Sequence, residues 1–387
     1  MCQDTYLLHY IFRDYEVHTM EKVRAFLARK NITFSAKRYF IDAMSAMAQG
    51  LFCTLLVGTI LDTIGKQFGI GFLTDTFLTI KQGDVTFYYT IGGFCSLMVG
   101  PAMAVAIGKA LEAPPLVLFS LITVGFATNV LGGTGGPLAV FFVAILAAEV
   151  GKAISKETKI DILVTPIVTI LAGIGFAALV ARPIGTAATS VGDAIKWATE
   201  LQPFFMGILV SVIIGVALTL PISSAAICAS LGLTGLAGGA AVAGCCAQMV
   251  GFAIMSFREN RWGGLVAQGI GTSMLQMGNI VRNPRIWIPP TLASAITGPI
   301  ATCLFKLEMN GAAVSSGMGT CGLVGQIGVY TGWLADIDAG VKASITAMDW
   351  VGLVLVCFVL PAILSWLIAL PLRKWGWIGE NDLKLDL

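Results

Sequence analysis

The sequence predicts an all-α, polytopic membrane protein of about eight to ten spans, with re-entrant hairpins between regular helices. Of its 387 residues, 56% are hydrophobic and only 12% are charged, whereas soluble globular chains carry roughly 25% charged residues. The charges also leave long uncharged runs, nearly all of which reach the about 20 residues that a helical span requires. These runs cover residues 43–61, 85–108, 113–148, 162–181, 201–257, 262–281, 286–305, 309–335 and 350–372.

The same composition excludes several other classes of protein. The net charge is +2 and no basic run interleaves with aromatic residues, so we expect no nucleic-acid partner. Nine cysteines are present without a C-x-x-C pair, and all but one lie in apolar stretches, so we expect buried free thiols. No cluster of His, Cys and Asp exists, so we expect no metal site and no cofactor.

The two ends of the chain set the expected orientation. Residues 20–30 can form a short amphipathic helix, and with Lys37 and Arg38 they make the most basic segment of the chain. The last run, 350–372, is followed by a basic and aromatic anchor, Arg373-Lys374-Trp375-Gly376-Trp377. By the positive-inside rule we expect both termini in the cytoplasm, with the spans in a bacterial inner membrane.

Three stretches rich in Gly, Pro and hydroxyl residues predict interruptions of the helices. They are Leu131-Gly-Gly-Thr-Gly-Gly-Pro137, residues 221–235 and residues 309–332. Gly-rich backbone at membrane depth is tolerated only against protein or a water-filled cavity. We therefore expect re-entrant segments or discontinuous helices, as in transporters. For the first stretch, an ordinary tight extracellular turn explains the sequence equally well.

The predicted interior offers neutral hydrogen-bonding groups in place of carboxylates and histidines. Gln268, Thr272, Gln276 and Asn279 are spaced by four, four and three residues, so we expect them on one face of a helix. The remaining candidate substrate-binding residues are Ser273, Asn283, Ser223 and Ser224. Such amides and hydroxyls suit a sugar-like neutral polar small molecule, and the absence of interior charge argues against a proton relay. The alternative is that they bond to neighbouring helices. We assign no catalytic residue.

Two segments resemble a known family. The stretch Gly271-Thr-Ser-Met-Leu-Gln-Met-Gly-Asn-Ile-Val-Arg-Asn-Pro-Arg-Ile-Trp-Ile-Pro-Pro290, together with Gly100-Pro-Ala-Met-Ala-Val-Ala-Ile-Gly-Lys109, is similar to the membrane-embedded IIC component of the bacterial phosphotransferase sugar system. More specifically, the chain resembles the IIC-like branch related to the perfringolysin regulator. The resemblance implies a homodimer in the membrane lipid, re-entrant hairpins in the C-terminal half and an elevator-like movement.

The resemblance also implies an activity, namely phosphate transfer to the sugar from a separate IIB protein. The family's sugar-binding loop usually offers a glutamate, whereas this chain has Gly278-Asn279 at the matching place. The chain contains no IIA or IIB domain. We therefore expect any phosphotransferase activity to depend on separate IIA and IIB proteins.

These observations predict four regions and a leading function. Residues 1–38 are expected to form a cytoplasmic extension, with its first 19 residues non-essential, followed by the amphipathic helix. Residues 39–200 form an N-terminal scaffold and dimerisation region, residues 201–377 a C-terminal substrate region, and residues 378–387 a cytoplasmic tail. The leading hypothesis is a IIC-like permease of the phosphoenolpyruvate-dependent sugar phosphotransferase system. The alternative is a membrane-embedded sensor or regulator that keeps the fold without transport.

Overall fold

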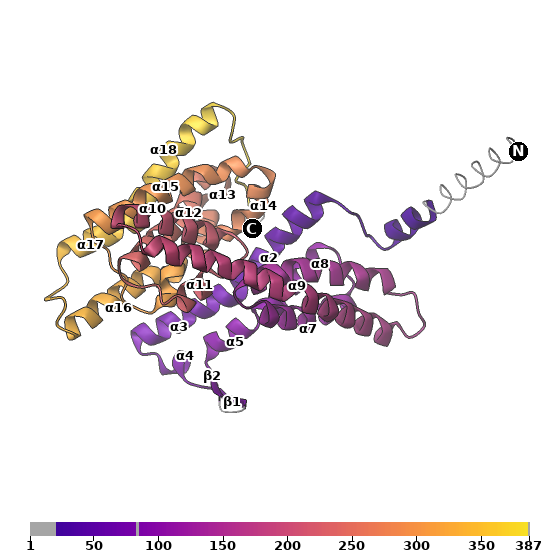
Figure 1. Ribbon diagram of the computed structural model, residues 1–387. Coiled ribbons are helices and arrows are strands. Elements are labelled where there is room, and N and C mark those ends of the chain that lie inside the picture. Colours follow the sequence, from indigo (N-terminus) through magenta and orange to yellow (C-terminus); the bar gives the residue numbers. More distant parts are fainter. Residues whose placement is uncertain (1–20, 83–84, 386–387) are drawn as a thin grey trace, which may run out of the picture.

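The computed structural model describes residues 21–82 and 85–385, and it confirms the all-α membrane fold (Figure 1). The expectation for residues 1–19 lies outside the described part. Residues 21–29 form the expected N-terminal helix. One long helical segment follows, built from a π-helical stretch Lys37–Ala43, α2 (Met44–Leu51), a second π-helical stretch Phe52–Leu56 and α3 (Val57–Phe68). Wide π-turns of this kind often mark functional positions in a helix.

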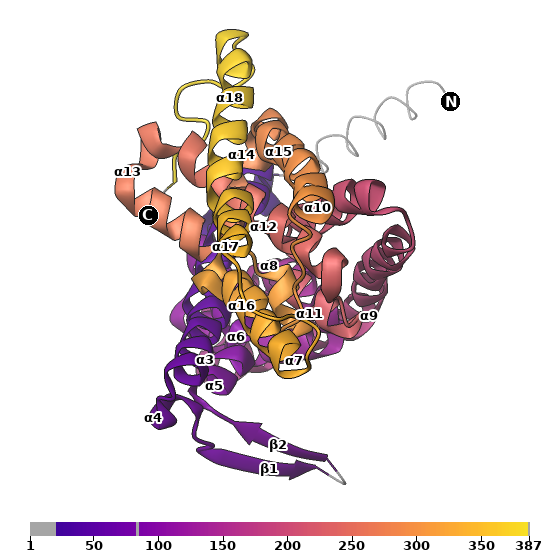
Figure 2. The same cartoon turned by 90° about the vertical axis from the view of Figure 1, so that its left-hand side faces the viewer.

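A β-hairpin follows α3, in a region where no strand was expected. The short helix α4 (Gly71–Thr74) leads into β1 (Leu78–Gln82), which pairs antiparallel with β2 (Val85–Tyr89). The register places Leu78 opposite Tyr89. The hairpin projects from the helical body (Figure 2). The uncharged run at residues 85–108 therefore begins with a strand, and only its second half is available for a span.

The N-terminal helices follow the hairpin, and α7 and α8 among them lie at the right of Figure 1. They are α5 (Ile91–Leu97) and α6 (Val99–Ala110), which are bent by 49° at their junction, then α7 (Pro115–Gly132), α8 (Gly136–Ile154) and α9 (Asp161–Thr199). Glycines allow two of these backbones to touch, since a Cβ on Gly100 would lie 2.3 Å from the carbonyl oxygen of Gly125. Small residues are the usual means of close helix packing in membranes.

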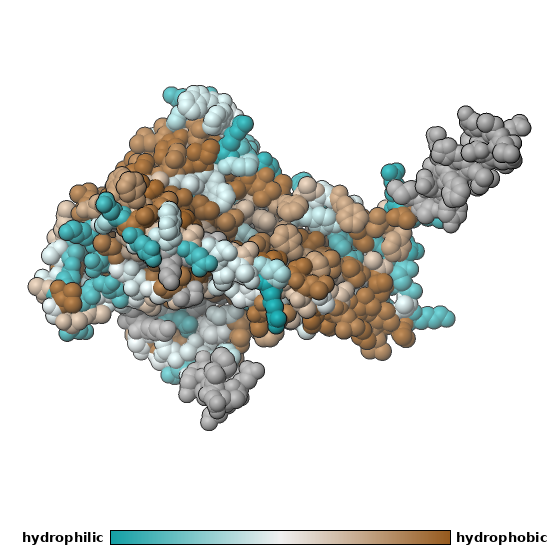
Figure 3. Space-filling model, viewed as in Figure 1, coloured by the Kyte–Doolittle hydropathy of each residue, from teal (hydrophilic) through white to brown (hydrophobic). Residues whose placement is uncertain are grey.

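The outer surface of this group is apolar. Phe119 and Val130 of α7 and Leu171 and Leu179 of α9 are all more than 60% exposed. Figure 3 shows a broad hydrophobic surface over this part of the molecule, with hydrophilic side chains gathered toward its end. An apolar patch of this extent on a monomer indicates contact with lipid or with another protein.

The C-terminal helices surround a central helix, α12 (Gly235–Met255), which is almost completely buried. Around it lie α10 (Pro203–Thr219), α11 (Ser224–Ser230), α13 (Phe257–Val266), α14 (Met277–Arg282), α15 (Ile288–Pro299), α16 (Val324–Asp338), α17 (Ala347–Val354) and α18 (Leu360–Lys374). Close backbone contact recurs here, because a Cβ on Gly244 of α12 would lie 1.9 Å from the carbonyl oxygen of Ser211 in α10.

Among the described residues, 5 helical segments are long and apolar enough to cross a membrane, or 6 when the bent α5–α6 pair counts as one span. One of them, Pro115–Ile154, comprises two helices, α7 and α8, that pack against each other as a hairpin. The helix α10 is apolar but shorter than a full span. Counting by length therefore gives fewer spans than the expected eight to ten, because several helices are short or interrupted.

Candidate functional site

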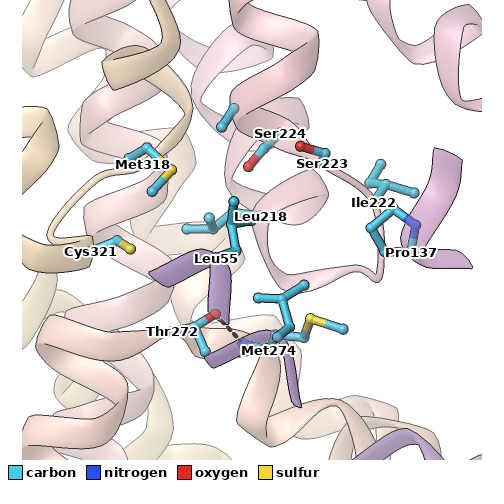
Figure 4. Close-up of a pocket in the computed structure, with 12 residues that line it drawn as sticks. Leu55, Pro137, Leu218, Ile222, Ser223, Ser224, Thr272, Met274, Met318 and Cys321 are labelled. Atoms are coloured by element: carbon cyan, nitrogen blue, oxygen red, sulfur yellow. Dashed lines mark hydrogen bonds between the residues drawn. The ribbon is translucent and has the colours of Figure 1, made fainter. Parts of the chain in front are cut away.

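Four interrupted segments and the first long helix meet around one cavity, which we call the central cavity (Figure 4). The interruptions are the α7–α8 turn, the α10–α11 junction, the stretch before α14 and the stretch before α16. The lining residues are Leu51, Leu55, Pro137, Leu218, Ile222, Ser223, Ser224, Ala225, Thr272, Met274, Met318 and Cys321. All three Gly/Pro-rich stretches singled out in the sequence thus reach the same place.

The α7–α8 turn is held inside the protein. Gly133 has a φ of +52°, a conformation that favours glycine. The carbonyl oxygen of Thr134 accepts a hydrogen bond from the Ser223 amide at 3.2 Å. A Cβ on Gly135 would lie 2.7 Å from the carbonyl oxygen of Ile184 in α9. This turn packs against α9 and the α10–α11 junction, which is the setting expected for interrupted backbone within a membrane protein.

The α10–α11 junction presents two serines beside the cavity. Ser223 caps α11, since its hydroxyl accepts a hydrogen bond from the Ala226 amide at 3.2 Å. The hydroxyl of Ser224 donates to the carbonyl oxygen of Gly317 at 2.8 Å. This second bond ties the α10–α11 junction to the interrupted stretch before α16, so two of the breaks support each other.

The stretch before α16 runs through the interior as irregular backbone. Met309 and Gly235 exchange two backbone hydrogen bonds of 3.0 and 3.1 Å. The hydroxyl of Ser316 donates to the carbonyl oxygen of Leu233 at 2.6 Å. Left-handed φ angles occur at Gly319, Gly322 and Leu323. Residues 315–321 are buried, so their polar backbone is covered by protein, as the re-entrant prediction requires.

The stretch before α14 corrects the prediction of a single helical face. Ala267–Gly271 is π-helical, Thr272 is extended with a φ of −158°, and Ser273–Gln276 is a 3₁₀-helix. Because the backbone turns at Thr272, its hydroxyl points into the central cavity and accepts from the Met274 amide at 3.2 Å. Gln268, Gln276 and Asn279 still contact one another but lie away from this cavity. The regular spacing therefore does not place all four side chains on one surface.

The central cavity is small and sparsely polar in this conformation. Its volume is about 50 Å³, which holds only a few water molecules. Hydroxyls are contributed by Ser223, Ser224 and Thr272, Cys321 adds a thiol, and no carboxylate lies among the described lining residues. A monosaccharide does not fit unless the surrounding segments move apart. We call this conformation, in which the cavity is too small for a sugar, the closed state.

The predicted amides form a chain of hydrogen bonds that ends on the C-terminal segment, residues 378–385. Gln276 donates to Gln268 at 2.8 Å and Asn279 donates to Gln276 at 2.8 Å. Gln276 also donates to the carbonyl oxygen of Leu383 at 2.9 Å, and Asn279 to that of Lys384 at 2.8 Å. These amides are therefore engaged with the protein itself in the closed state.

Two further candidates have structural partners. Asn283 donates to the carbonyl oxygen of Trp377 at 2.9 Å and to the Asp382 carboxylate at 2.7 Å. The Ser273 hydroxyl lies 2.8 Å from that of Thr219 within the fully buried core. Of the eight candidate residues, the structure brings Ser223, Ser224 and Thr272 to the central cavity and places the other five elsewhere.

A second cavity, which we call the polar cavity, lies on the other side of the α14 stretch. It has a volume of about 470 Å³. Its lining residues are Ile41, Asp42, Ser45, Ala46, Gln49, Ala110, Leu275, Asn279, Arg282, Asn381, Lys384 and Leu385. Asp42 comes from the first long helix and Lys384 from the C-terminal segment, so parts of the chain that are far apart in sequence meet at one cavity.

Sequence reasoning missed several parts of this site. Leu51, Leu55 and Met318 line the central cavity but carry no chemical signal that separates them from ordinary apolar residues. The C-terminal segment carried a weak signal, because polar residues around Asp382 follow the aromatic anchor. The described cysteines are all free, and Cys321 is the one that lines the central cavity.

Fold and site together define a class of protein: a helical membrane protein whose interrupted helices enclose a small cavity with neutral hydrogen-bonding groups, as transporters do. A family model described as "Phosphotransferase system, EIIC" matches residues 41–385. The chain belongs to this family and is a permease component of the phosphotransferase system. Comparison with curated proteins and with solved structures gave no significant match.

Proposed function

We propose that the chain translocates a sugar or a closely related neutral polar solute through the central cavity. The observation that carries this proposal is the convergence of four interrupted segments on that cavity. Breaks of this kind expose backbone polar groups and give the chain hinge points around the solute. Thr272, Ser223 and Ser224 are the proposed first contacts, because their hydroxyls line the cavity.

The proposal includes an orientation and a partner. Arg282 and Lys384 line the polar cavity, and Arg38 lies near it, bonded to the carbonyl oxygen of Leu111 beside the lining residue Ala110. Because these residues are basic, we assign this side to the cytoplasm of a bacterial cell. A separate IIB protein reaches the solute from that side, and the chain works as a homodimer through the apolar N-terminal surface. The proposed solute contacts are hydroxyls, so binding does not require a charged solute.

Uptake into proteoliposomes tests the proposal. A panel of radiolabelled sugars is offered to the purified protein, with and without phosphorylated IIB protein. We expect accumulation of at least one sugar, and we expect Thr272→Val to reduce it several-fold, because one hydrogen bond to the solute is worth about 1 kcal/mol. The matched control is Thr128→Val, since the Thr128 hydroxyl donates to the carbonyl oxygen of Val124 within its own helix, α7.

Two outcomes would count against transport. Equal loss of uptake in both valine variants would show that the cavity hydroxyl has no special role. If no sugar enters under any condition while deletion of the gene changes expression of other genes, the chain is a sensor or regulator on the same fold.

A further inference from the structure

The C-terminal segment, residues 378–385, docks on the helical body as if it were a bound peptide. Ile378 is 2% exposed and Leu383 is fully buried, and both belong to the same hydrophobic cluster as Met274, Leu275 and Ile280. The segment folds back beside α13 and α14 after the anchor that ends α18, where Asn260 and Asn279 bind its backbone (Figure 1). Because these two buried side chains are separated by polar residues, they fix the position of the segment along the helical body.

Side-chain amides hold the backbone of this segment. Asn260 donates to the carbonyl oxygen of Leu383 at 2.7 Å and accepts from the Leu385 amide at 2.8 Å. Gln276 and Asn279 add donors to successive carbonyl groups, as described above. Asn283 fixes the start of the segment at the Trp377 carbonyl. We call these four side chains the amide groove.

A turn within the segment completes the docking. The Asp382 carboxylate accepts from the Gly379 amide and from Asn283, both at 2.7 Å. Arg285 lies over the Trp377 ring, with its guanidinium carbon 5.3 Å from the ring centroid. The side chains that make these contacts are spread over residues 260–285. The groove is therefore formed by the folded α13–α14 region as a whole.

The location of the segment suggests what it does. Asn381, Lys384 and Leu385 form one wall of the polar cavity, and Asp42, Ser45 and Gln49 lie on other walls. The two cavities are neighbours, because Met274 lines the central cavity and Leu275 lines the polar cavity. The first long helix also borders both, with Gln49 on one and Leu51 on the other. A solute that passed from the central cavity into the polar cavity would therefore meet the C-terminal segment.

We propose that residues 378–385 are an internal plug that occupies the amide groove and narrows the polar cavity. The plug covers the Gln276 and Asn279 amides, which are 0% and 7% exposed, and it must leave before a solute or a partner protein reaches them. Its backbone carbonyls take up the donors of both side chains. The docking of the segment does not depend on transport, whereas its consequence for uptake rests on the proposed function.

Thiol labelling of the polar cavity tests the plug. A cysteine at Ala46→Cys reports on the cavity, and Ser344→Cys in an exposed loop reports on general reactivity. Both are labelled in detergent with a bulky maleimide, and the modified sites are read by peptide mass mapping. In the full chain we expect slow labelling at residue 46. In a chain that ends after Trp377 we expect labelling faster on the order of tenfold, because the rate follows the open fraction.

Two additional arms separate a plug from a purely structural tail. The full-length double variant Asn260→Ala, Asn283→Ala weakens the groove without removing the segment, and it should also label faster at residue 46. A synthetic peptide with the sequence of residues 378–387 should restore slow labelling to the truncated chain, and a scrambled peptide should not. Unchanged labelling in the truncated chain, no effect of the peptide, or a parallel rise at residue 344 would overturn the proposal.

Since this test uses no sugar, its result is independent of the uptake experiment. A plug that opens in a chain without uptake would leave the proposed function refuted and the plug supported. Uptake by a chain whose residue 46 labels equally with and without the segment would refute the plug and support the proposed function.

Discussion

Two buried glutamines give opposite predictions when each is replaced by leucine of similar size. Gln276 is fully buried and makes three hydrogen bonds, to Gln268, to the carbonyl oxygen of Leu383 and from Asn279. Gln326 is also buried, but its Nε2 donates only to the sulfur of Cys246 at 3.2 Å, and its Oε1 accepts no hydrogen bond from the described residues.

The expected loss of unfolding free energy depends on which groups each substitution leaves without a hydrogen bond. In Gln276→Leu the Leu383 carbonyl keeps its Asn260 donor and Asn279 keeps the Lys384 carbonyl, while the Gln268 oxygen loses its partner. One buried unpaired group costs about 1–3 kcal/mol, and the lost bonds add about 1 kcal/mol each. The unpaired Gln268 oxygen and the two other lost bonds together give an expected destabilisation of roughly 3–5 kcal/mol.

In Gln326→Leu the substitution removes an acceptor that has no partner among the described residues. Replacing such a group with an apolar one of the same shape is nearly neutral or stabilising. We therefore expect Gln276→Leu to lower the free energy of unfolding by several kcal/mol more than Gln326→Leu does. Unfolding in mixed detergent micelles, followed by tryptophan fluorescence, measures both free energies. Equal destabilisation of the two variants, or a larger loss for Gln326→Leu, would refute the reasoning.

Two other predictions concern packing and pH. Gly244→Ala should lower the free energy of unfolding by about 1–3 kcal/mol, because the new Cβ would lie 1.9 Å from the Ser211 carbonyl oxygen. Gly175→Ala should raise the free energy of unfolding by up to about 1 kcal/mol, because a Cβ at that position meets open space. Similar effects of the two substitutions would contradict this account. The hydrogen bond from Lys30 holds the pKa of Glu157 below its ordinary value of 4.5, so the ion pair contributes fully above that value and is lost as the pH falls through the lowered pKa. At neutral pH, amide hydrogens of the helix at residues 21–29 should therefore be better protected from exchange than in Glu157→Gln, and this difference should vanish as the pH falls through the lowered pKa. Equal protection in the two proteins at neutral pH would exclude the ion pair as the cause.

The positions of the helix breaks were predictable because their chemistry is local. The turn at Pro137, the junction at Ser223 and the left-handed backbone at Gly319 all lie in stretches whose Gly, Pro and hydroxyl content disfavours a regular helix. The hairpin that was missed also had a local signal. The dipeptide Gly-Asp, a sequence typical of hairpin turns, separates two stretches rich in β-branched and aromatic residues.

The arrangement of the candidate site was only partly predictable, because it depends on long-range contacts. The spacing of Gln276 and Asn279 correctly predicts that they touch, since they lie within one short helical stretch. The spacing fails at Thr272, where the extended backbone ends the helical periodicity. Periodicity also carries no information on the docking of Leu383, which lies more than one hundred residues away from the amides that hold it.

The central claim is that the cavity formed by the four interrupted segments holds the translocated solute. Cys321 is a native reporter of that cavity and is 4% exposed in the closed state. Labelling of Cys321 with a small methanethiosulfonate reagent, in proteoliposomes and with each sugar of the uptake panel, measures occupancy directly. The account predicts that the sugar that is taken up, and not its non-transported analogues, slows the labelling of Cys321. Equal labelling rates with and without the transported sugar would contradict it.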